Sequence, residues 1–235
     1  MILTAHQPVY LPWLGLFHKI ALADAFCYFD DVQYLKKDWN NRNKIKTTNG
    51  PLWLTVPVLT TDHREKTIRE IEINNSLNWR KKHWISILNN YRKTPHFNRY
   101  SDFFEDLYKR EWRYLSQLNE HMLLWFLKEL GISIDFTRAS EKKFNGTKSD
   151  LVLDMCKNLG AQTYIFGSLG KDYAHIEDFS NAGVHVLFQE YHHPVYPQLH
   201  GDFVPYMSII DLLFNCGERS LDIIMSGNMT KKDIV

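Results

Sequence analysis

The sequence lacks several features that would point directly to one class of protein. Net charge is only +1 in a chain of 235 residues, with 28 lysines and arginines against 27 aspartates and glutamates. This balance does not produce the strong positive field that gathers nucleic acid non-specifically, so we expect no nucleic-acid partner. No apolar run reaches the roughly 20 residues that a spanning helix needs, and no basic leader precedes a long apolar segment. We therefore expect no membrane insertion and a cytoplasmic protein.

Cysteine is scarce, and common catalytic signatures are missing. Cys27, Cys156 and Cys216 are far apart, odd in number and without CxxC spacing, which argues against a disulfide framework or a structural zinc site. The chain has no GxSxG nucleophile elbow and no GK[ST] ending of a P-loop. We expect a reducing compartment, and we expect Cys27, inside an apolar stretch, to be a core residue.

The histidines of the C-terminal third do not have metal-site spacing. His192 and His193 are adjacent, and neighbouring side chains of an extended segment point to opposite sides, so both rings cannot reach one ion without distortion. Helical HExxH spacing is also absent. We expect no metal site here, even with His200 and Glu190 nearby.

The chain does have a high aromatic content of 14% and the element order of a parallel α/β fold. An apolar start, 2–5, predicts a first buried strand, and 25–34 predicts a second because its first half is almost wholly apolar. Residues 147–191 then read as helix, strand, glycine loop, helix and strand. We predict one α/β domain over 1–235, with a mainly parallel sheet flanked by helices, of HUP or Rossmann type.

The remaining segments predict elements around that sheet. A helical insertion or layer is expected over 74–131, and the polar residues 226–235 are expected to form a flexible tail. The other expected elements are a helix at 14–23, a hairpin at 43–58 with a turn at Asn49-Gly50, an alternating strand at 68–73, a helix capped by Ser76 and reaching Tyr91, a long helix at 101–131 and a final helix at 207–217.

The stretch His6–Ile20, HQPVYLPWLGLFHKI, leaves the first strand where ligands gather in open α/β sheets, outside the carboxyl ends of the strands. His6 is suited there to act as a general base, and Gln7 to orient an amide or hydroxyl. Tyr10 and Trp13 could stack on a substrate ring. Plainer interpretations stay open, namely a histidine that only caps the turn and aromatic residues that belong to the core.

A glycine-bearing loop after a late strand, GSLGKDY, is the second candidate. The backbone amides of Gly167, Ser168 and Gly170 could bind a phosphate, because glycines let an anion approach the backbone closely. Lys171 adds a point charge and Tyr173 a hydroxyl at what we expect to be the same sheet edge as the end of the first strand. A simple tight turn is the alternative.

A donor-rich run, NNRNKIK, is the third candidate. Arg42 could clamp a carboxylate or phosphate with two parallel hydrogen bonds, and Asn43 could recognise hydroxyls or amides. A solvated hairpin arm is the plainer interpretation, and the residues alone favour it. Asp31, at the end of the second strand, could bind an amine, a ribose or Mg²⁺, although paired aspartates are also a common turn signal.

The chain resembles the WbqC-like family of bacterial proteins over essentially its full length. The resemblance is carried by three groups of sequence segments: AHQPVYLPWLGLFHKI, DDVQYLKKDWNNRNKIK with PLWLTVPV, and YIFGSLGKDY with FQEYHHPVYPQ. Members of that family are encoded among genes for O-antigen and other surface polysaccharides. The resemblance implies a cytoplasmic transferase that adds an acyl or aminoacyl group to an amino-sugar nucleotide. It carries over no catalytic residues, so the site residues above rest on their own chemistry.

In such a reaction His6 would be the base, the glycine loop with Lys171 would hold phosphates, and Arg42 with Asn43 would hold sugar or donor. The donor could be a thioester on an acyl carrier protein. An acidic carrier of this kind could dock on the basic helix face Arg80–His83.

A fainter similarity is to HUP-type nucleotide-binding folds, in which a histidine motif and a late basic loop bracket nucleotide phosphates. His6 and the loop Gly167–Lys171 have similar places in chain order, but HQPVYLPW stands where that class has HxGH. Two alternatives therefore remain. One is a nucleotidyl transferase or ligase that uses ATP, and the other is a non-catalytic protein that binds a sugar nucleotide or a carrier protein.

Overall fold

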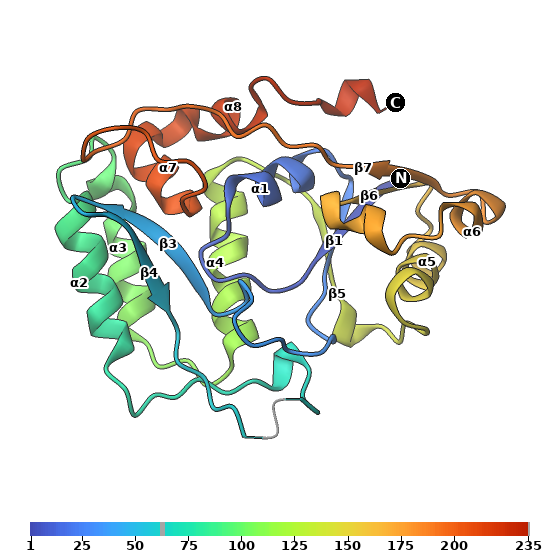
Figure 1. Cartoon of the computed structure of the whole chain (residues 1–235), viewed down its shortest axis with the longest axis horizontal. Helices are drawn as coiled ribbons and strands as arrows, with labels where there is room; N and C mark the ends of the chain where they lie inside the picture. The colour runs from blue at the N-terminus through green and yellow to red at the C-terminus, as the bar shows by residue number, and fades with distance from the viewer. Residues whose placement is uncertain (62–63, 235) are drawn as a thin grey trace.

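The computed structural model describes residues 1–61 and 64–234, and its centre is a sheet of five parallel strands (Figure 1). The strands lie in the order β5-β2-β1-β6-β7, and every neighbouring pair is parallel. The predicted α/β class, a mainly parallel sheet flanked by helices, is confirmed. The strands are β1 (Ile2–His6), β2 (Ala25–Tyr28), β5 (Asp135–Arg138), β6 (Thr163–Phe166) and β7 (His185–Phe188).

Alternate residues of the sheet point to its two faces and enter separate hydrophobic clusters, as the two-residue period of a strand requires. On β2, Phe26 and Tyr28 pack in the larger core, whereas Ala25 and Cys27 pack in the smaller one. Burial of both faces explains the nearly continuous apolar strands. It also raises the pKa of the Cys27 thiol to about 12, which confirms this cysteine as a core residue. The covering helices are α1 (Leu14–Ala21) on the first face and α5 (Lys148–Leu159) and α6 (Ile176–Asn181) on the second.

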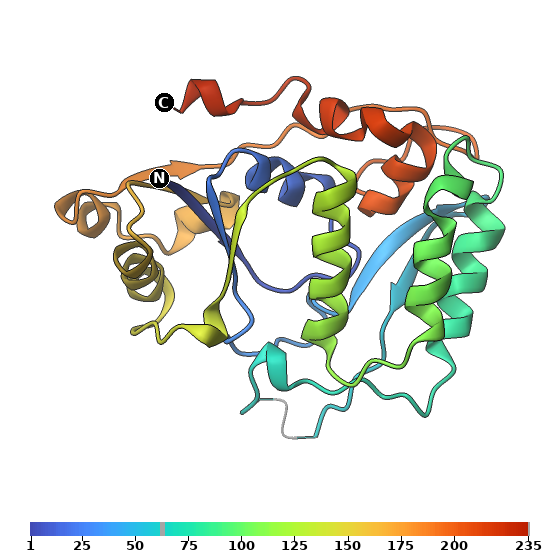
Figure 2. The same ribbon diagram turned by 180° about the vertical axis from the view of Figure 1, so that it is seen from behind.

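The larger core also contains a hairpin and further helices. β3 pairs antiparallel with β4 across a two-residue connection, as the hairpin prediction required. Helix α4 stands between the parallel sheet and the α2–α3 pair in both views (Figures 1 and 2). The elements of this part are β3 (Arg42–Thr47), β4 (Gly50–Thr55), α2 (Trp79–Tyr91), α3 (Phe97–Lys109), α4 (Leu115–Glu129), α7 (Ile209–Cys216) and α8 (Ser220–Met225).

The single long helix predicted over 101–131 is wrong, because the structure has two helices there. Helix α3 ends at Lys109, and the chain is extended at Arg110. The carbonyl of Arg113 then accepts a hydrogen bond from the backbone of Ile73 at 2.8 Å, a pairing that a continuous helix would not allow. Among the described residues, no helix is both long and apolar enough to span a bilayer.

The alternating segment 68–73 is not a strand of either sheet, so that prediction is wrong too. It begins with a single 3-10 turn, Ile68–Glu70, and afterwards makes only isolated bridges, such as that between Glu72 and Tyr114. Strict alternation reports that one side of a segment is buried. It does not supply a neighbouring strand.

The C-terminal segment, expected to be a flexible tail, is tied to the body of the protein. The side chain of Asn228 accepts from the backbone N–H of His192 at 2.7 Å and donates to its carbonyl at 2.9 Å. Lys231 forms an ion pair with Asp24 at the start of the sheet. These contacts fasten the tail across the end of α1, next to the sheet.

Candidate functional site

His6 ends β1 at the point where the strand order reverses. β1 pairs with β2 on one side and with β6 on the other, so the connections leave in opposite directions. Open α/β sheets bind ligands at such a switch point. The ladder between β1 and β6 ends with Thr4 paired to Ile165, and His6 and Gly167 each follow two residues later at the carboxyl ends of these neighbouring strands. The first two predicted candidates therefore begin side by side at the carboxyl edge of the sheet.

The His6 ring has the tautomer that a general base needs. Nδ1 lies 2.8 Å from the backbone carbonyl oxygen of Gln7. Because a carbonyl only accepts, Nδ1 carries the proton and Nε2 keeps its lone pair. Burial, followed by the nearby Lys19 ammonium, lowers the His6 pKa to about 4. At neutral pH the ring is thus uncharged, and Nε2 can accept a proton.

Lys19 is the residue of this site that sequence reasoning missed. Every residue of α1 from Leu14 to Ile20 is buried, and the Lys19 Nζ donates to the carbonyl of Ala5 at 2.9 Å. No carboxylate of the described chain pairs with this ammonium, and burial lowers its pKa to about 8. A signal was present, because a helix that is apolar almost all round is a buried helix, and its few polar residues are buried with it.

The glycine loop forms a 3-10 turn in which one glycine has a packing role. A Cβ added to Gly170 would lie 2.6 Å from the Cβ of Phe166, whereas one added to Gly167 would have no neighbour within 4 Å. Lys171 forms an exposed ion pair with Glu190 at 2.7 Å. The lysine expected to hold a phosphate therefore already has an anionic partner, and the backbone at Gly167 is the more open part of the loop.

Ser168, Tyr173 and Trp13 complete the surroundings of this edge. Ser168 is exposed, and the Tyr173 ring lies edge-on against Phe166 with centroids 5.9 Å apart. Trp13 begins α1 and contacts Tyr191 edge to face at 5.5 Å. Trp13 thereby joins the opening motif to the irregular segment that follows β7.

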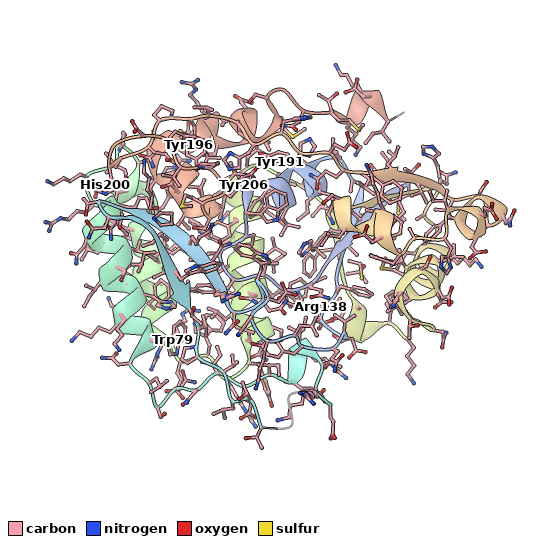
Figure 3. The ribbon with its side chains drawn as sticks, in the orientation of Figure 1. Trp79, Arg138, Tyr191, Tyr196, His200 and Tyr206 are labelled. Atoms are coloured by element: carbon pink, nitrogen blue, oxygen red, sulfur yellow. The ribbon has the colours of Figure 1, made fainter. Side chains whose placement is uncertain are left out.

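The histidines of that irregular segment have structural partners. His193 Nδ1 donates to the carbonyl of Pro194 at 2.9 Å, and His200 Nε2 lies 2.9 Å from the carbonyl of Asn90. The His193 ring packs among three tyrosines that Figure 3 labels, Tyr191, Tyr196 and Tyr206.

One group in the described part of the chain has ligand atoms close enough together for a metal ion. Asp150, His175 and Asp178 place theirs within 4.8 Å of one another. All three side chains are exposed, and the histidine also contacts the carboxylate of Asp178 at 3.6 Å. Nothing else in their surroundings points to an ion, so we assign them no metal role.

Two buried asparagines hold the HQPVYLPW loop in its shape. Asn40 Nδ2 donates to the carbonyl of Pro8 at 2.7 Å, and Asn43 Nδ2 donates to that of Leu11 at 2.6 Å. Asn43 Oδ1 accepts from the backbone of Lys44 at 2.8 Å, so both ends of the amide are in use. Leu11 has a φ of 46°, a conformation that a residue with a side chain adopts only under constraint. Asn43 is therefore a positioning residue for the loop.

Tyr10 lies in the core and not at the carboxyl edge. Its ring has no exposed surface, and its hydroxyl is hydrogen-bonded to His83 Nδ1 at 2.8 Å and to the Tyr108 hydroxyl at 2.5 Å. Stacking on a substrate would need an open ring face, which Tyr10 does not have. His83 is likewise buried and Arg80 is half-buried, so Lys81 and Lys82 are the exposed residues of the basic face predicted over Arg80–His83.

Arg42 lies on the hairpin, at the start of β3, whereas Asp31 follows β2, three residues after the Tyr28 that pairs with His6. Arg42 is half-buried, with Cζ 4.7 Å from the centre of the Trp53 ring and Nη2 donating to the carbonyl of Lys37. Asp31 is exposed and forms an ion pair with Arg69 at 2.8 Å. The carboxyl ends of neighbouring strands thus carry His6, Gln7, the glycine loop and Asp31, whereas Arg42 lies on the separate hairpin.

Comparison with known proteins shows the family of the chain. The model of the WbqC-like protein family matches residues 7–223, a span that begins just after His6 and includes both asparagines and the glycine loop. The chain belongs to the WbqC-like protein family. This WbqC-like protein is also 35% identical over 218 residues to the uncharacterized protein Rv1507c of Mycobacterium tuberculosis (strain ATCC 25618 / H37Rv), covering 92% of the present chain and 94% of that relative. No solved structure matches it.

Proposed function

We propose that this WbqC-like protein is a transferase of bacterial surface-polysaccharide biosynthesis that adds an acyl or aminoacyl group to the amine of an amino-sugar nucleotide. One observation carries the proposal: His6 is a neutral imidazole at the switch point of a parallel sheet, with Nδ1 bonded to the Gln7 carbonyl. In the described chain its Nε2 makes no hydrogen bond, so it is available to a substrate. Membership of the family supports the choice of pathway.

The chemistry needs a group that takes one proton. The sugar amine attacks the carbonyl carbon of an acyl thioester, and a C–N bond forms as the C–S bond breaks. His6 Nε2 takes the proton that the amine loses and passes it to the departing thiolate. Phosphates of the bound substrate would raise the His6 pKa from about 4, because a nearby negative charge favours the protonated ring. Binding of an anionic substrate would therefore strengthen the base.

A groove between α2 and α3 supports a carrier protein as the source of the thioester. The groove has a volume of about 300 Å³ and is lined in part by Arg80, Lys81 and Lys109. Glu105 also lines it, and Arg80 and Lys109 are paired with Glu111 and Glu105, so in the described chain Lys81 is the lining cation without an ion pair that could attract an acidic carrier. Tyr108 lines the groove and is hydrogen-bonded to Tyr10, which connects the groove to the HQPVYLPW loop.

The test is acyl transfer by the purified protein. It would be incubated with UDP-linked amino sugars and acyl or aminoacyl thioesters of a carrier protein, and the products would be weighed by mass spectrometry. His6→Ala should abolish transfer while sugar-nucleotide binding stays nearly intact. His185→Ala is the matched control, because His185 is exposed at the opposite, amino end of the same sheet. Equal turnover by His6→Ala and wild type would remove His6 from the chemistry.

Nucleotidyl transfer is the second candidate, favoured by the position of His6 at the switch point, on the strand next to the one that Gly167 follows. It predicts that, with Mg²⁺ and an acid substrate present, the protein releases pyrophosphate from ATP. Binding of a sugar nucleotide without turnover, with all pathway substrates supplied, would instead identify a non-catalytic binding protein.

A further inference from the structure

Two exposed tryptophans touch each other on the hairpin side of the molecule. Trp39 precedes β3 and Trp53 lies on β4, and each keeps 44% of its surface exposed. Their ring centroids are 5.3 Å apart, and their planes are tilted by 37°. A single exposed apolar residue is ordinary, whereas two indoles in contact make a continuous apolar surface on which a ligand can pack.

Two cations lie against the same indole. Arg42 Cζ is 4.7 Å and Lys44 Nζ 5.6 Å from the centre of the Trp53 ring, and Lys44 is the cross-strand partner of Trp53. The Arg42 side chain is held in place, because Nη2 donates to the carbonyl of Lys37. Its Nε is buried and has no acceptor, and neither cation has an ion pair in the described chain. The positive charge beside the indoles is therefore ordered and not neutralised.

This surface adjoins the opening loop. The carbonyl of Trp39 accepts from the backbone of Tyr10 at 3.2 Å, and the next residue, Asn40, holds the carbonyl of Pro8. Tyr10 lies four positions after His6, so their Cα atoms are at most about 14 Å apart. This surface is therefore connected, through Trp39 and Asn40, to the loop that begins at His6.

We propose that this surface binds a nucleoside diphosphate. The hairpin platform, as we name it, consists of Trp39, Arg42, Lys44 and Trp53. Indole faces bind flat aromatic rings of any base, and unpaired cations beside them bind phosphate, so the combination fits an aromatic base linked to an anion. The proposal deepens the proposed function, on which it rests for the sugar that the diphosphate carries.

The test is calorimetric titration of the full-length protein with UDP, without any sugar or thioester. Uridine, which lacks phosphate, and ribose 5-phosphate, which lacks a base, should each bind more weakly than UDP. Trp53→Ala should raise the Kd for UDP about tenfold or more, as loss of one stacked base does. Trp84→Ala on α2 and Arg92→Gln directly after that helix are the matched controls, and neither should change the Kd. Arg42→Gln should weaken UDP binding and leave uridine binding unchanged.

Other outcomes would overturn the proposal. The first is an unchanged Kd for UDP in Trp53→Ala. The second is that this variant loses self-association in analytical ultracentrifugation while its UDP binding is intact. The third is that the platform binds vesicles of phosphatidylglycerol and phosphatidylcholine and the protein does not bind UDP. Circular dichroism would check that each variant is folded. UDP binding through the platform without any transfer would disprove only the proposed function. If Trp39→Ala and Trp53→Ala both catalyse transfer with an unchanged KM for the sugar nucleotide, only the proposed role of the platform would be disproved.

Discussion

Replacement of Lys19 by methionine should make the protein more stable at neutral pH and its His6 more basic. Lys19 is buried and has no carboxylate partner in the described chain, and its pKa falls from the ordinary 10.5 to about 8. That difference corresponds to about 3 kcal/mol by which folding disfavours the charged amine. Loss of the hydrogen bond to the Ala5 carbonyl removes about 1 kcal/mol of stabilisation, so the net gain at pH 7 should be about 2 kcal/mol.

The dependence on pH gives the sign of the effect. Between about pH 8 and 10.5 the unfolded chain holds a proton on Lys19 that the folded chain has released, so the wild type gains stability as pH rises through this window. Lys19→Met should lack this gain. Its advantage is therefore largest below pH 8 and is lost near pH 9.5, because about 1.4 kcal/mol per pH unit offsets a gain of about 2 kcal/mol within about 1.5 units.

Urea denaturation at pH 7 and at pH 10 would measure the change in the free energy of unfolding. The melting temperature of Lys19→Met should be about 4–8 °C above that of the wild type at pH 7 for a chain of this size. NMR titration of the His6 ring should give a pKa above 4 in Lys19→Met, because the Lys19 charge contributes to its depression. Lys46→Met is the control, since that buried ammonium donates to the carbonyls of Gly201 and Asp202 and, unlike Lys19, favours the charge of a buried carboxylate, Asp211, so it should be needed for stability. A Lys19→Met variant that is less stable than wild type at pH 7, with an unmoved His6 pKa, would refute the reasoning.

Two further predictions concern the supports of the site. Asn43→Ala should lower the free energy of unfolding by about 2 kcal/mol in urea titrations, because the buried carbonyl of Leu11 loses its donor; a change below a few tenths would show that the loop holds its shape unaided. Gly170→Ala should cost about 1–3 kcal/mol, since the new Cβ would meet Phe166, whereas Gly167→Ala should be nearly neutral in the same assay. Equal effects of the two glycine substitutions would contradict the packing role of Gly170.

Local patterns predicted elements well where one residue and its near neighbours decide the structure. The apolar start, the second strand and the hairpin all follow from runs and turn residues that lie together in the sequence. Strand β5, Asp135–Arg138, was missed because it has two charged residues in four and pairs only with the edge of β2. It forms a strand because it pairs with β2, which lies more than a hundred residues earlier in the chain.

The sequence likewise predicted one part of the candidate site and missed another. The position of His6 and the glycine loop at a common edge followed from the order of elements in a parallel sheet. The roles of the polar residues around them did not. Asn43 looked like a donor for a sugar, but its amide holds Leu11, and Tyr10 looked like a stacking ring, but it bonds Tyr108, which is 98 residues away.

By itself the sequence determined the fold class, the family and the edge of the sheet at which to look, because periodicity, turn chemistry and block order are local properties. Only the tertiary structure decided which groups are buried, paired or left charged. Burial and Coulomb interactions depend on neighbours that the chain brings together from distant segments, and they set the neutral His6, the unpaired Lys19 and the open indoles of the hairpin platform.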